Sequence, residues 1–570
     1  MFSFIRTHCK LCALIFTIVN WFVWVGFYPS LQNDDFQIYS MLCGYGENPG
    51  PYGIYTNIVL GYIICLLQHI STNINWYLAI LFSIAFTCTT CFNFLLLEQL
   101  QKSPSKNPFA KLRFFATFLL LLYVNRLVLS NLQYTHVGTI ACCTSALLVY
   151  RILTRGARFI SVTVCLLLTI AGFSLRNQTL VPFSFACIGM ITAGILSFPT
   201  TQSHKKSIAL VLVVLATLLA TLSFTHRYLY ENSPEWQTAS DFLEARVSIQ
   251  DYPDNSGLDK TALIERKGLS VKETQIFRSF IYVPGMDHLS KVRDLADIHR
   301  QGRKGLMGSS FAAEHNILTP TAKQFKEPFS SLMTITPWGT LGVAFFLFII
   351  SINRQSIQCN GPVLLAFGAY MACLLILGRS PGRVVHPMVI TTAFWVLIHL
   401  PNEAPLLQKR WMAWGSWGVC ALGVAFCFRH SFHWRPSSPR AEAHEYCAAR
   451  PENLYITTNQ QGCGLFPVGF TGYSMDYLHK TNVLPVGDGW MFYTPAYRAA
   501  LAARKIENPY RELLKDNVYV ITFRQEDKWV LKQLSALHEL YTGQGVEFSK
   551  VHAIGEHSFW KAHQLPNAAK

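Results

Sequence analysis

The chain has 570 residues, of which 51% are hydrophobic and only 14% are charged, and its formal net charge is +16. Soluble domains carry about a quarter charged residues, so this composition excludes an ordinary soluble protein. The positive charge does not indicate nucleic-acid binding, because the basic residues lie in short loops between apolar runs, where they set membrane orientation. We therefore predict a polytopic membrane protein, in contact with membrane lipid and with no nucleic-acid partner.

Apolar runs of about 17 to 23 residues, each long enough to cross a bilayer, recur along the first three quarters of the chain. The apolar run 56–70 is shorter, so we expect it to lie along the membrane surface as an interfacial helix within an outer loop 29–75. We predict an all-α membrane domain over residues 1–428, with about eleven transmembrane helices near 11–28, 76–97, 114–130, 137–153, 158–173, 180–198, 207–225, 337–352, 362–378, 386–400 and 411–428.

The distribution of basic residues supports this topology. With the run 56–70 outside the membrane, the cytoplasmic loops contain 14 Lys and Arg residues and the short outer loops contain 3. Such an excess of basic residues on one side predicts a protein of the cell membrane whose N-terminus lies on the cytoplasmic side. A soluble insertion, 227–336, and a C-terminal domain, 429–570, then both lie on the extracytoplasmic side.

The C-terminal domain has the pattern of a small α/β fold. The segments "ENLYITTNQ" (452–460) and "DNVYVITFR" (516–524) are typical of short strands, and "DKWVLKQLSALHELY" (527–541) of an amphipathic helix. Most of the 16 cysteines lie within apolar runs, where they act as small hydrophobic residues. Cys447 and Cys463 lie in the polar tail, where a disulfide between them is one alternative.

Two adjacent carboxylates, Asp34 and Asp35 in "QNDDFQ", follow the first predicted span and fall on its outer side. One interpretation is a helix N-terminus, where acidic side chains satisfy free backbone N–H groups. The other is catalytic, because a carboxylate beside the lipid interface can take the proton of an acceptor hydroxyl as a bond to a leaving phosphate breaks.

A phosphate-linked donor requires positive groups on the same side. Arg side chains suit bidentate phosphate binding, and charges near the hydrocarbon boundary are often functional. The alternatives are snorkelling to the interface for the arginine within a span and ordinary solvated side chains for the loop arginines. The candidates for the donor phosphate are Arg126, Arg176, Arg379, Arg383 and His386.

Aromatic and acidic residues also gather in the tail segment "LPVGDGWMFYTPAYRAAL". Such residues bind carbohydrate by stacking and hydrogen bonding, although packing in the protein core explains them equally well. Asp488, Trp490 and Tyr493 are the candidates for acceptor binding.

Together these features resemble the GT-C superfamily of integral membrane glycosyltransferases. The matching parts are "NDDF" after the first span, the surface helix 56–70 before the second span, and the tail after the last span. The first loop also looks like that of bacterial membrane proteins with a "DD…NP/G…LG…NWY" pattern, found here in Asp34, Asp35, Gly61 and Asn75-Trp76-Tyr77.

The resemblance implies transfer of a sugar from a polyprenyl-phosphate donor, with inversion, to an extracytoplasmic glycan, lipid or protein acceptor in cell-envelope polysaccharide biosynthesis. One of the two aspartates, with a slight preference for Asp34, would be the general base, and the arginines would hold the lipid phosphate. Some members of the superfamily use a divalent metal and others do not. No cofactor is required by the residues present, although Glu47 is available for recruitment to a metal.

Three other functions compete with this one. A polysaccharide polymerase or ligase predicts catalytic residues in the insertion and a dispensable aspartate pair. A flippase or transporter predicts ionisable residues near the middle of several spans and two halves of related hydropathy. A membrane acyltransferase requires a catalytic histidine within the membrane region, and His136 and His386 lie only at span ends.

Overall fold

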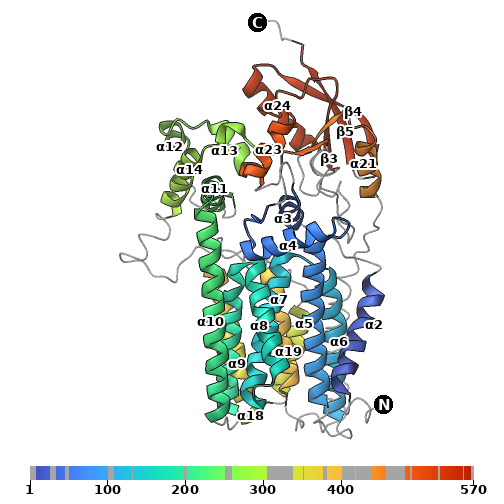
Figure 1. Cartoon of the computed structure of the whole chain (residues 1–570), viewed down its shortest axis with the longest axis vertical. Coiled ribbons are helices and arrows are strands. Elements are labelled where there is room, and N and C mark those ends of the chain that lie inside the picture. Colours follow the sequence, from blue (N-terminus) through green and yellow to red (C-terminus); the bar gives the residue numbers. More distant parts are fainter. Residues whose placement is uncertain are drawn as a thin grey trace.

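The structure of the chain is a computed structural model (Figure 1). The residues that it describes are 8–25, 34–44, 50–100, 108–130, 132–197, 202–250, 260–303, 338–350, 352–376, 382–400, 418, 439–457, 482–487, 491–523, 527–555 and 557–566.

Long apolar helices run side by side and form a bundle (Figure 1). Helix α7 lies at the centre of the bundle, where 89% of its most apolar 18-residue stretch is buried. Helix α10 lies at the periphery, and only 17% of the corresponding stretch is buried. The bundle helices are α2 (Cys9–Val25), α5 (Trp76–Leu100), α6 (Pro108–Ser130), α7 (Tyr134–Arg155), α8 (Phe159–Leu175), α9 (Leu180–Ser197), α10 (Gln202–Glu231), α17 (Trp338–Ile350), α18 (Arg354–Ile376) and α19 (Gly382–Ile398).

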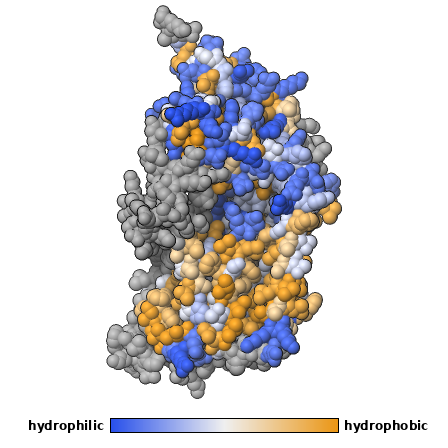
Figure 2. All heavy atoms as spheres, turned by 90° about the vertical axis from the view of Figure 1, so that its left-hand side faces the viewer, coloured by the Kyte–Doolittle hydropathy of each residue, from blue (hydrophilic) through white to orange (hydrophobic). Residues whose placement is uncertain are grey.

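Among the described residues, five helices are long and apolar enough to cross a membrane, and several apolar helices are shorter. The bundle helices coincide with all predicted spans except 411–428, of which a single residue is described; the predicted number of about eleven spans is not confirmed. Figure 2 shows apolar side chains over the bundle and hydrophilic ones beyond its end. Leu210, Val213 and Phe224 of α10, each more than half exposed, contribute to this apolar surface.

Two short helices lie on one end of the bundle, which we call the upper end as it is drawn in Figure 1. They are α3 (Asp34–Leu42) and α4 (Ile58–Ile70), and α4 runs across the bundle, as the short length of the run 56–70 predicts. Helix α4 begins where the Asn57 side chain accepts a hydrogen bond of 3.0 Å from the Val59 amide. Gly61 lets α4 approach the preceding loop, because a Cβ there would lie 1.9 Å from the Pro51 carbonyl oxygen.

Helix α10 continues beyond the bundle into the predicted insertion, so this helix is longer than the span predicted over 207–225 and the insertion begins as a helix. The rest of the described insertion is also helical. It comprises α11 (Pro234–Gln250), α12 (Thr261–Arg266), α13 (Val271–Arg278), the 3-10 helix η2 (Pro284–Met286) and α14 (Leu289–Arg303).

The C-terminal part contains a five-stranded mixed sheet with the strand order β2-β1-β3-β5-β4. Strand β1 (Leu454–Thr457) pairs in parallel with β2 (Val483–Pro485) and β3 (Val518–Phe523). Strand β5 (His557–Gln564) pairs antiparallel with β3 and with β4 (Val546–Ile554). The helices are α21 (Pro439–Ala448), the 3-10 helix η6 (Met491–Tyr493), α23 (Pro495–Ala503) and α24 (Asp527–Thr542). The strands predicted in 452–460 and 516–524 and the helix predicted in 527–541 are therefore confirmed.

The insertion and the C-terminal sheet pack against each other, and we call the two together the upper module. Ile281 and Gly487 form an antiparallel bridge, and the Tyr510 hydroxyl donates to the Tyr282 carbonyl oxygen at 2.5 Å. An ion pair joins Arg498 to Asp287 at 3.0 Å. These contacts unite two regions that the membrane helices separate in the sequence.

Candidate active site

The acidic pair begins helix α3, and its two members have different environments. Both lie in the first helical turn, where their negative charge is favourable at the positive end of the helix dipole. The Asp34 side chain is 16% exposed, whereas Asp35 is completely buried. Consecutive residues of an α-helix point about 100° apart, so one carboxyl group faces the surface and the other faces the protein interior.

Asp35 is held by two donors from the bundle helices. The Tyr77 hydroxyl donates to Asp35 Oδ1 at 2.8 Å, and the Tyr134 backbone N–H donates to the same oxygen at 2.9 Å. Oδ2 is buried and has no hydrogen-bond partner among the described residues. Burial raises the pKa of Asp35 well above its usual value, against the smaller opposing effect of these hydrogen bonds. Burial therefore favours the protonated form of Asp35 more than it would for an exposed aspartate.

Asp34 makes an ion pair with Arg383, the second residue of α19. Arg383 Nη1 lies 3.4 Å from Asp34 Oδ2, and the Arg383 side chain is 28% exposed. The two residues are 349 positions apart in the sequence. The fold therefore brings together one predicted base and one predicted phosphate ligand at the upper end of the bundle, with both side chains partly open to solvent.

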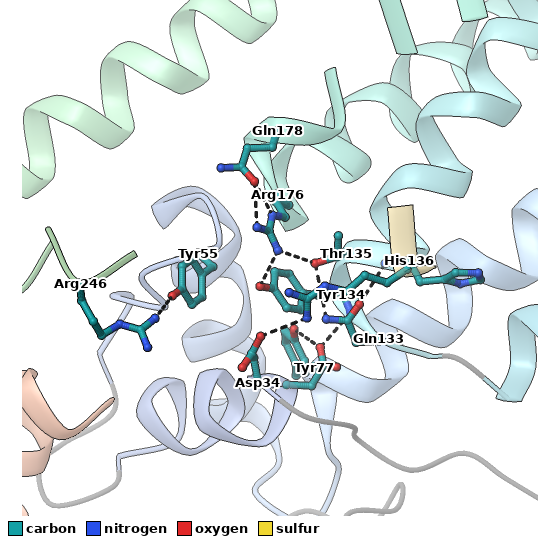
Figure 3. Close-up of polar contacts among 12 residues, drawn as sticks. Asp34, Tyr55, Tyr77, Gln133, Tyr134, Thr135, His136, Arg176, Gln178 and Arg246 are labelled. Carbon is teal, nitrogen blue, oxygen red and sulfur yellow. Dashed lines mark hydrogen bonds and ion pairs between the residues drawn. The ribbon is translucent and has the colours of Figure 1, made fainter. Parts of the chain in front are cut away.

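Arg176 lies between α8 and α9 and is embedded in polar and aromatic groups (Figure 3). Its Nη1 donates to the Tyr134 hydroxyl at 3.0 Å and to the Thr135 hydroxyl at 2.8 Å. Its Nε and Nη2 both donate to the Gln178 side-chain oxygen, at 3.0 and 2.8 Å. Gln178 is exposed, so this fork of two N–H groups points toward solvent and holds a single oxygen atom.

Tyr55, Tyr134 and Arg246 contribute to this site and were not predicted from the sequence. The Tyr55 ring stacks on Tyr134, with ring centroids 6.3 Å apart, and the Arg176 guanidinium lies 5.8 Å from the Tyr55 centroid. The Tyr55 hydroxyl accepts a hydrogen bond of 3.0 Å from Arg246 Nη2 of the insertion (Figure 3). Tyr134 thus joins the two parts of the site, since its backbone amide contacts Asp35 and its hydroxyl contacts Arg176.

The remaining predicted phosphate ligands differ in position. His386 of α19 lies near His136, with ring centroids 6.3 Å apart, and His136 points away from Arg176 (Figure 3). Arg126 is partly buried near the C-terminal end of α6. Arg379 lies outside the described residues.

Of the three residues predicted to bind the acceptor, the structure describes Tyr493. Tyr493 is buried, its ring stacks on Phe242 with centroids 4.1 Å apart, and its hydroxyl accepts from the Val283 amide at 3.2 Å. Tyr493 therefore packs inside the upper module and is not open to a sugar. Asp488 and Trp490 lie outside the described residues. Cys447 is a free, buried thiol, and Cys463 lies outside the described residues, so their disulfide stays a prediction.

The described residues do not form a metal site. Within them, no three His, Cys, Asp or Glu side chains lie close enough together to hold an ion. Asp35 is buried and Asp34 is paired with Arg383, so the pair does not offer the several free oxygen ligands that a divalent cation prefers. Glu47 lies outside the described part of the chain.

Comparison with known proteins gives one distant likeness. No model of a protein family matches the chain, and no curated protein matches it. Among solved structures, the crystal structure of the Archaeoglobus fulgidus oligosaccharyltransferase, tethered with an acceptor peptide containing the NVT sequon via a disulfide bond, matches with a TM-score of 0.34 and 12% identity, over 98% of this chain and 74% of that one. A likeness at this level does not identify the activity of this chain or its residues.

Proposed function

We propose that the chain is a membrane glycosyltransferase that moves a sugar from a polyprenyl-phosphate donor to an acceptor on the extracytoplasmic side. The observation that carries this proposal is the Asp34–Arg383 pair, with Asp34 Oδ2 and Arg383 Nη1 3.4 Å apart and both side chains partly exposed at the upper end of the bundle. A base and a phosphate-binding cation are then adjacent where a lipid-linked donor meets an acceptor from the aqueous side.

Asp34 is the general base in this mechanism. Its carboxylate takes the proton of an acceptor hydroxyl while the hydroxyl oxygen attacks the anomeric carbon of the donor sugar. The bond between that carbon and the phosphate oxygen breaks, and polyprenyl phosphate leaves with the bonding electron pair. A single displacement of this kind inverts the anomeric carbon. Asp35 is unsuited to this role, because its carboxyl group is completely buried against Tyr77 and burial raises its pKa.

The phosphate is held by Arg383 and Arg176. Arg383 is positioned to exchange Asp34 for a phosphate oxygen, which frees the carboxylate to act as a base at the moment when the donor is bound. In Arg176, the Nε and Nη2 donors that now share the Gln178 oxygen have the fork geometry that suits a phosphate oxygen. Arg126, Arg379 and His386 remain proposed contributors, and a glycan, a lipid or a protein remains the proposed class of acceptor.

The competing polymerase, transporter and acyltransferase functions gain no specific support. The described polar contacts of the insertion include an ion pair with the C-terminal part, Arg498 to Asp287, and the hydrogen bond from Arg246 to Tyr55 in the loop before α4. We therefore keep the glycosyltransferase as the single proposal, with the chain placed in the cell membrane and the upper end facing outward.

The test uses the full chain purified in detergent. Binding of farnesyl phosphate, a short polyprenyl monophosphate, is measured by calorimetry, with farnesol as the neutral control. Sugar transfer is then assayed with polyprenyl-phosphate sugars extracted from membranes. The proposal predicts binding of farnesyl phosphate but not of farnesol, and transfer that requires Asp34. Equal binding of both lipids, with no transfer from any donor, would contradict it.

A further inference from the structure

The loop before α4 is fastened to the upper part of α10 by a series of polar contacts. The Ile54 amide donates to the Tyr230 hydroxyl at 3.1 Å, and the Ile58 amide donates to His226 Nδ1 at 3.2 Å. The Asn57 side chain donates to the Leu222 carbonyl oxygen at 3.1 Å. The backbone that carries Tyr55 is thus held on both sides by the helix that leads into the insertion.

The conformation of this loop is one that its sequence does not favour. Ile54, the residue before Tyr55, has φ of 56°, in the left-handed region that β-branched residues avoid. Such backbone strain persists only where surrounding contacts impose it, and it gathers at functional sites. The neighbouring Tyr52 ring stacks on Trp236 of α11, with centroids 4.9 Å apart and planes 9° apart. The contacts with α10 and α11 are therefore what maintain Ile54, and with it Tyr55, in this position.

Besides the hydrogen bonds from α10 and the stacking of Tyr52 on Trp236, Arg246 is a third contact that holds the loop before α4. Its environment is unusual for a charged residue. It is 3% exposed, and its Nη1 donates to the Gln250 side chain at 2.7 Å while its Nη2 donates to the Tyr55 hydroxyl at 3.0 Å. Among the described residues, its Nε is buried without a hydrogen-bond partner, and no carboxylate forms an ion pair with Arg246. A buried guanidinium is costly unless its contacts compensate, so the hydrogen bond to Tyr55 is a specific one.

Tyr55 connects Arg246 with Arg176, the proposed phosphate ligand. Its ring lies against both Tyr134 and the guanidinium of Arg176, and Tyr134 in turn accepts a hydrogen bond from Arg176. Arg246, Tyr55 and Arg176 come from the insertion, the loop before α4 and the α8–α9 connection, and Figure 3 shows them in that order across the site. Moving Tyr55 would remove one of the two aromatic faces that fix the Arg176 side chain.

We propose that Arg246 is a positioning residue: through its hydrogen bond to Tyr55, the upper module sets the orientation in which Arg176 receives the donor phosphate. This inference rests on the proposed function, in which Arg176 is a phosphate ligand. Arg246 does not itself touch the donor. The insertion is thereby part of the donor site. An insertion that only bound the acceptor would have no such role.

The first test needs no ligand. Hydrogen–deuterium exchange of the full chain in detergent is compared for wild type, Arg246→Gln and Arg293→Gln. Arg293 is the matched control because it belongs to the same insertion but pairs with Asp241 at its surface. The proposal predicts faster exchange of the backbone amides in 52–58 and 174–179 in Arg246→Gln only. Faster exchange confined to α11, or equal in the two variants, would overturn it.

The second test is binding of farnesyl phosphate. Arg246→Gln and Tyr55→Phe should each weaken binding by about fivefold, and the double variant should be no weaker than either, because both changes break the same interaction. Arg246→Lys, which keeps a donor for the Tyr55 hydroxyl, should stay within about twofold of wild type. Additive losses in the double variant, or equal losses in Arg246→Lys and Arg246→Gln, would overturn the proposal. If wild type does not bind farnesyl phosphate, the proposed function fails, and the exchange experiment still decides the role of Arg246.

Discussion

Asp34 and Asp35 are adjacent in α3, yet Asp34 pairs with Arg383 at the partly exposed surface while Asp35 is completely buried against Tyr77. This division assigns them different chemistry. The partly exposed carboxylate of Asp34, beside an arginine, is open to an acceptor hydroxyl, whereas the carboxyl group of Asp35 is enclosed by the protein and burial raises its pKa.

The first prediction concerns Arg383. In Arg383→Gln, the positive charge beside Asp34 is lost, so farnesyl phosphate should bind about tenfold more weakly, corresponding to the loss of one charge-assisted contact. Arg383→Lys should recover part of the affinity. Calorimetry at low and high salt is the measurement, and the difference between wild type and Arg383→Gln should shrink as salt screens the charges. Equal affinity in wild type and Arg383→Gln at low salt would show that Arg383 is not a phosphate ligand.

A second prediction concerns the Gln178 oxygen that occupies the fork of Arg176. In Gln178→Ala the Nε and Nη2 donors are released to solvent, so a phosphate group no longer competes with the amide oxygen. Affinity for farnesyl phosphate should rise about two- to threefold, whereas Arg176→Lys, which lacks the fork, should lower it about tenfold. A loss of affinity in Gln178→Ala would indicate instead that Gln178 itself contacts the phosphate.

The third prediction is a pH dependence caused by Asp35. Its pKa is raised in the folded state, mainly by burial and in smaller part by the Asp34 charge, while Tyr77, Tyr134 and Arg383 act in the opposite direction. Its contribution to stability is therefore fully present below the ordinary pKa of an aspartate and is lost as the pH rises through the raised value. The unfolding temperature of the purified chain should fall as the pH rises from the ordinary pKa of an aspartate to the raised value, and then level off. Asp35→Asn cannot ionise, so its unfolding temperature should fall less over the same range.

The hydrogen bond from Tyr77 gives a companion measurement. Tyr77→Phe removes one of the two donors to the buried Oδ1 of Asp35, while the Tyr134 amide remains, and this should lower stability by about 0.5 to 1.5 kcal/mol. Tyr62 of α4 is 48% exposed, so Tyr62→Phe is the control for loss of a tyrosine hydroxyl and should change little. Equal unfolding temperatures in Tyr77→Phe and wild type would contradict the described environment of Asp35.

A fifth prediction tests the position of α4. In Gly61→Ala the new methyl group would meet the Pro51 backbone, with 1.9 Å to its carbonyl oxygen, so α4 or the loop must shift. Overpacking of this kind costs about 1 to 3 kcal/mol. Gly368 of α18 has no atom within 4 Å of such a group, and Gly368→Ala should be neutral or slightly stabilising. A stable Gly61→Ala variant would mean that α4 does not press on the loop.

Local sequence patterns predicted the elements well. The apolar runs became the bundle helices, the short run 56–70 became α4 on the end of the bundle, and the alternating tail segments became β1 and β3. These results depend on periodicity and length, which neighbouring residues determine. Strands β2, β4 and β5 were not predicted, and neither was the packing of the insertion on the C-terminal sheet, because their partners are distant in the sequence.

The site was predictable only in part for the same reason. Charges in loops that otherwise lack them pointed to Asp34, Asp35, Arg176 and Arg383 before their contacts were known. Tyr55, Tyr134 and Arg246 gave no such signal, since an aromatic residue in an apolar chain is typical of the core and Arg246 is one of several arginines in the polar insertion. Their roles arise from contacts such as that between Arg246 and Tyr55, 191 residues apart. The difference between Asp34 and Asp35 likewise depends on which face of α3 meets the bundle.

The most direct test of the central claim compares Asp34→Asn with Asp35→Asn in the same transfer assay. Both variants are first shown to be monodisperse in detergent, and polyprenyl-phosphate sugars extracted from membranes serve as donors. Asp34→Asn should lose about 100- to 10,000-fold in rate, as expected for removal of a general base, while Asp35→Asn, which changes a completely buried side chain to one of nearly the same shape, should stay within about tenfold of wild type. Full activity in Asp34→Asn, or a larger loss in Asp35→Asn, would contradict the account.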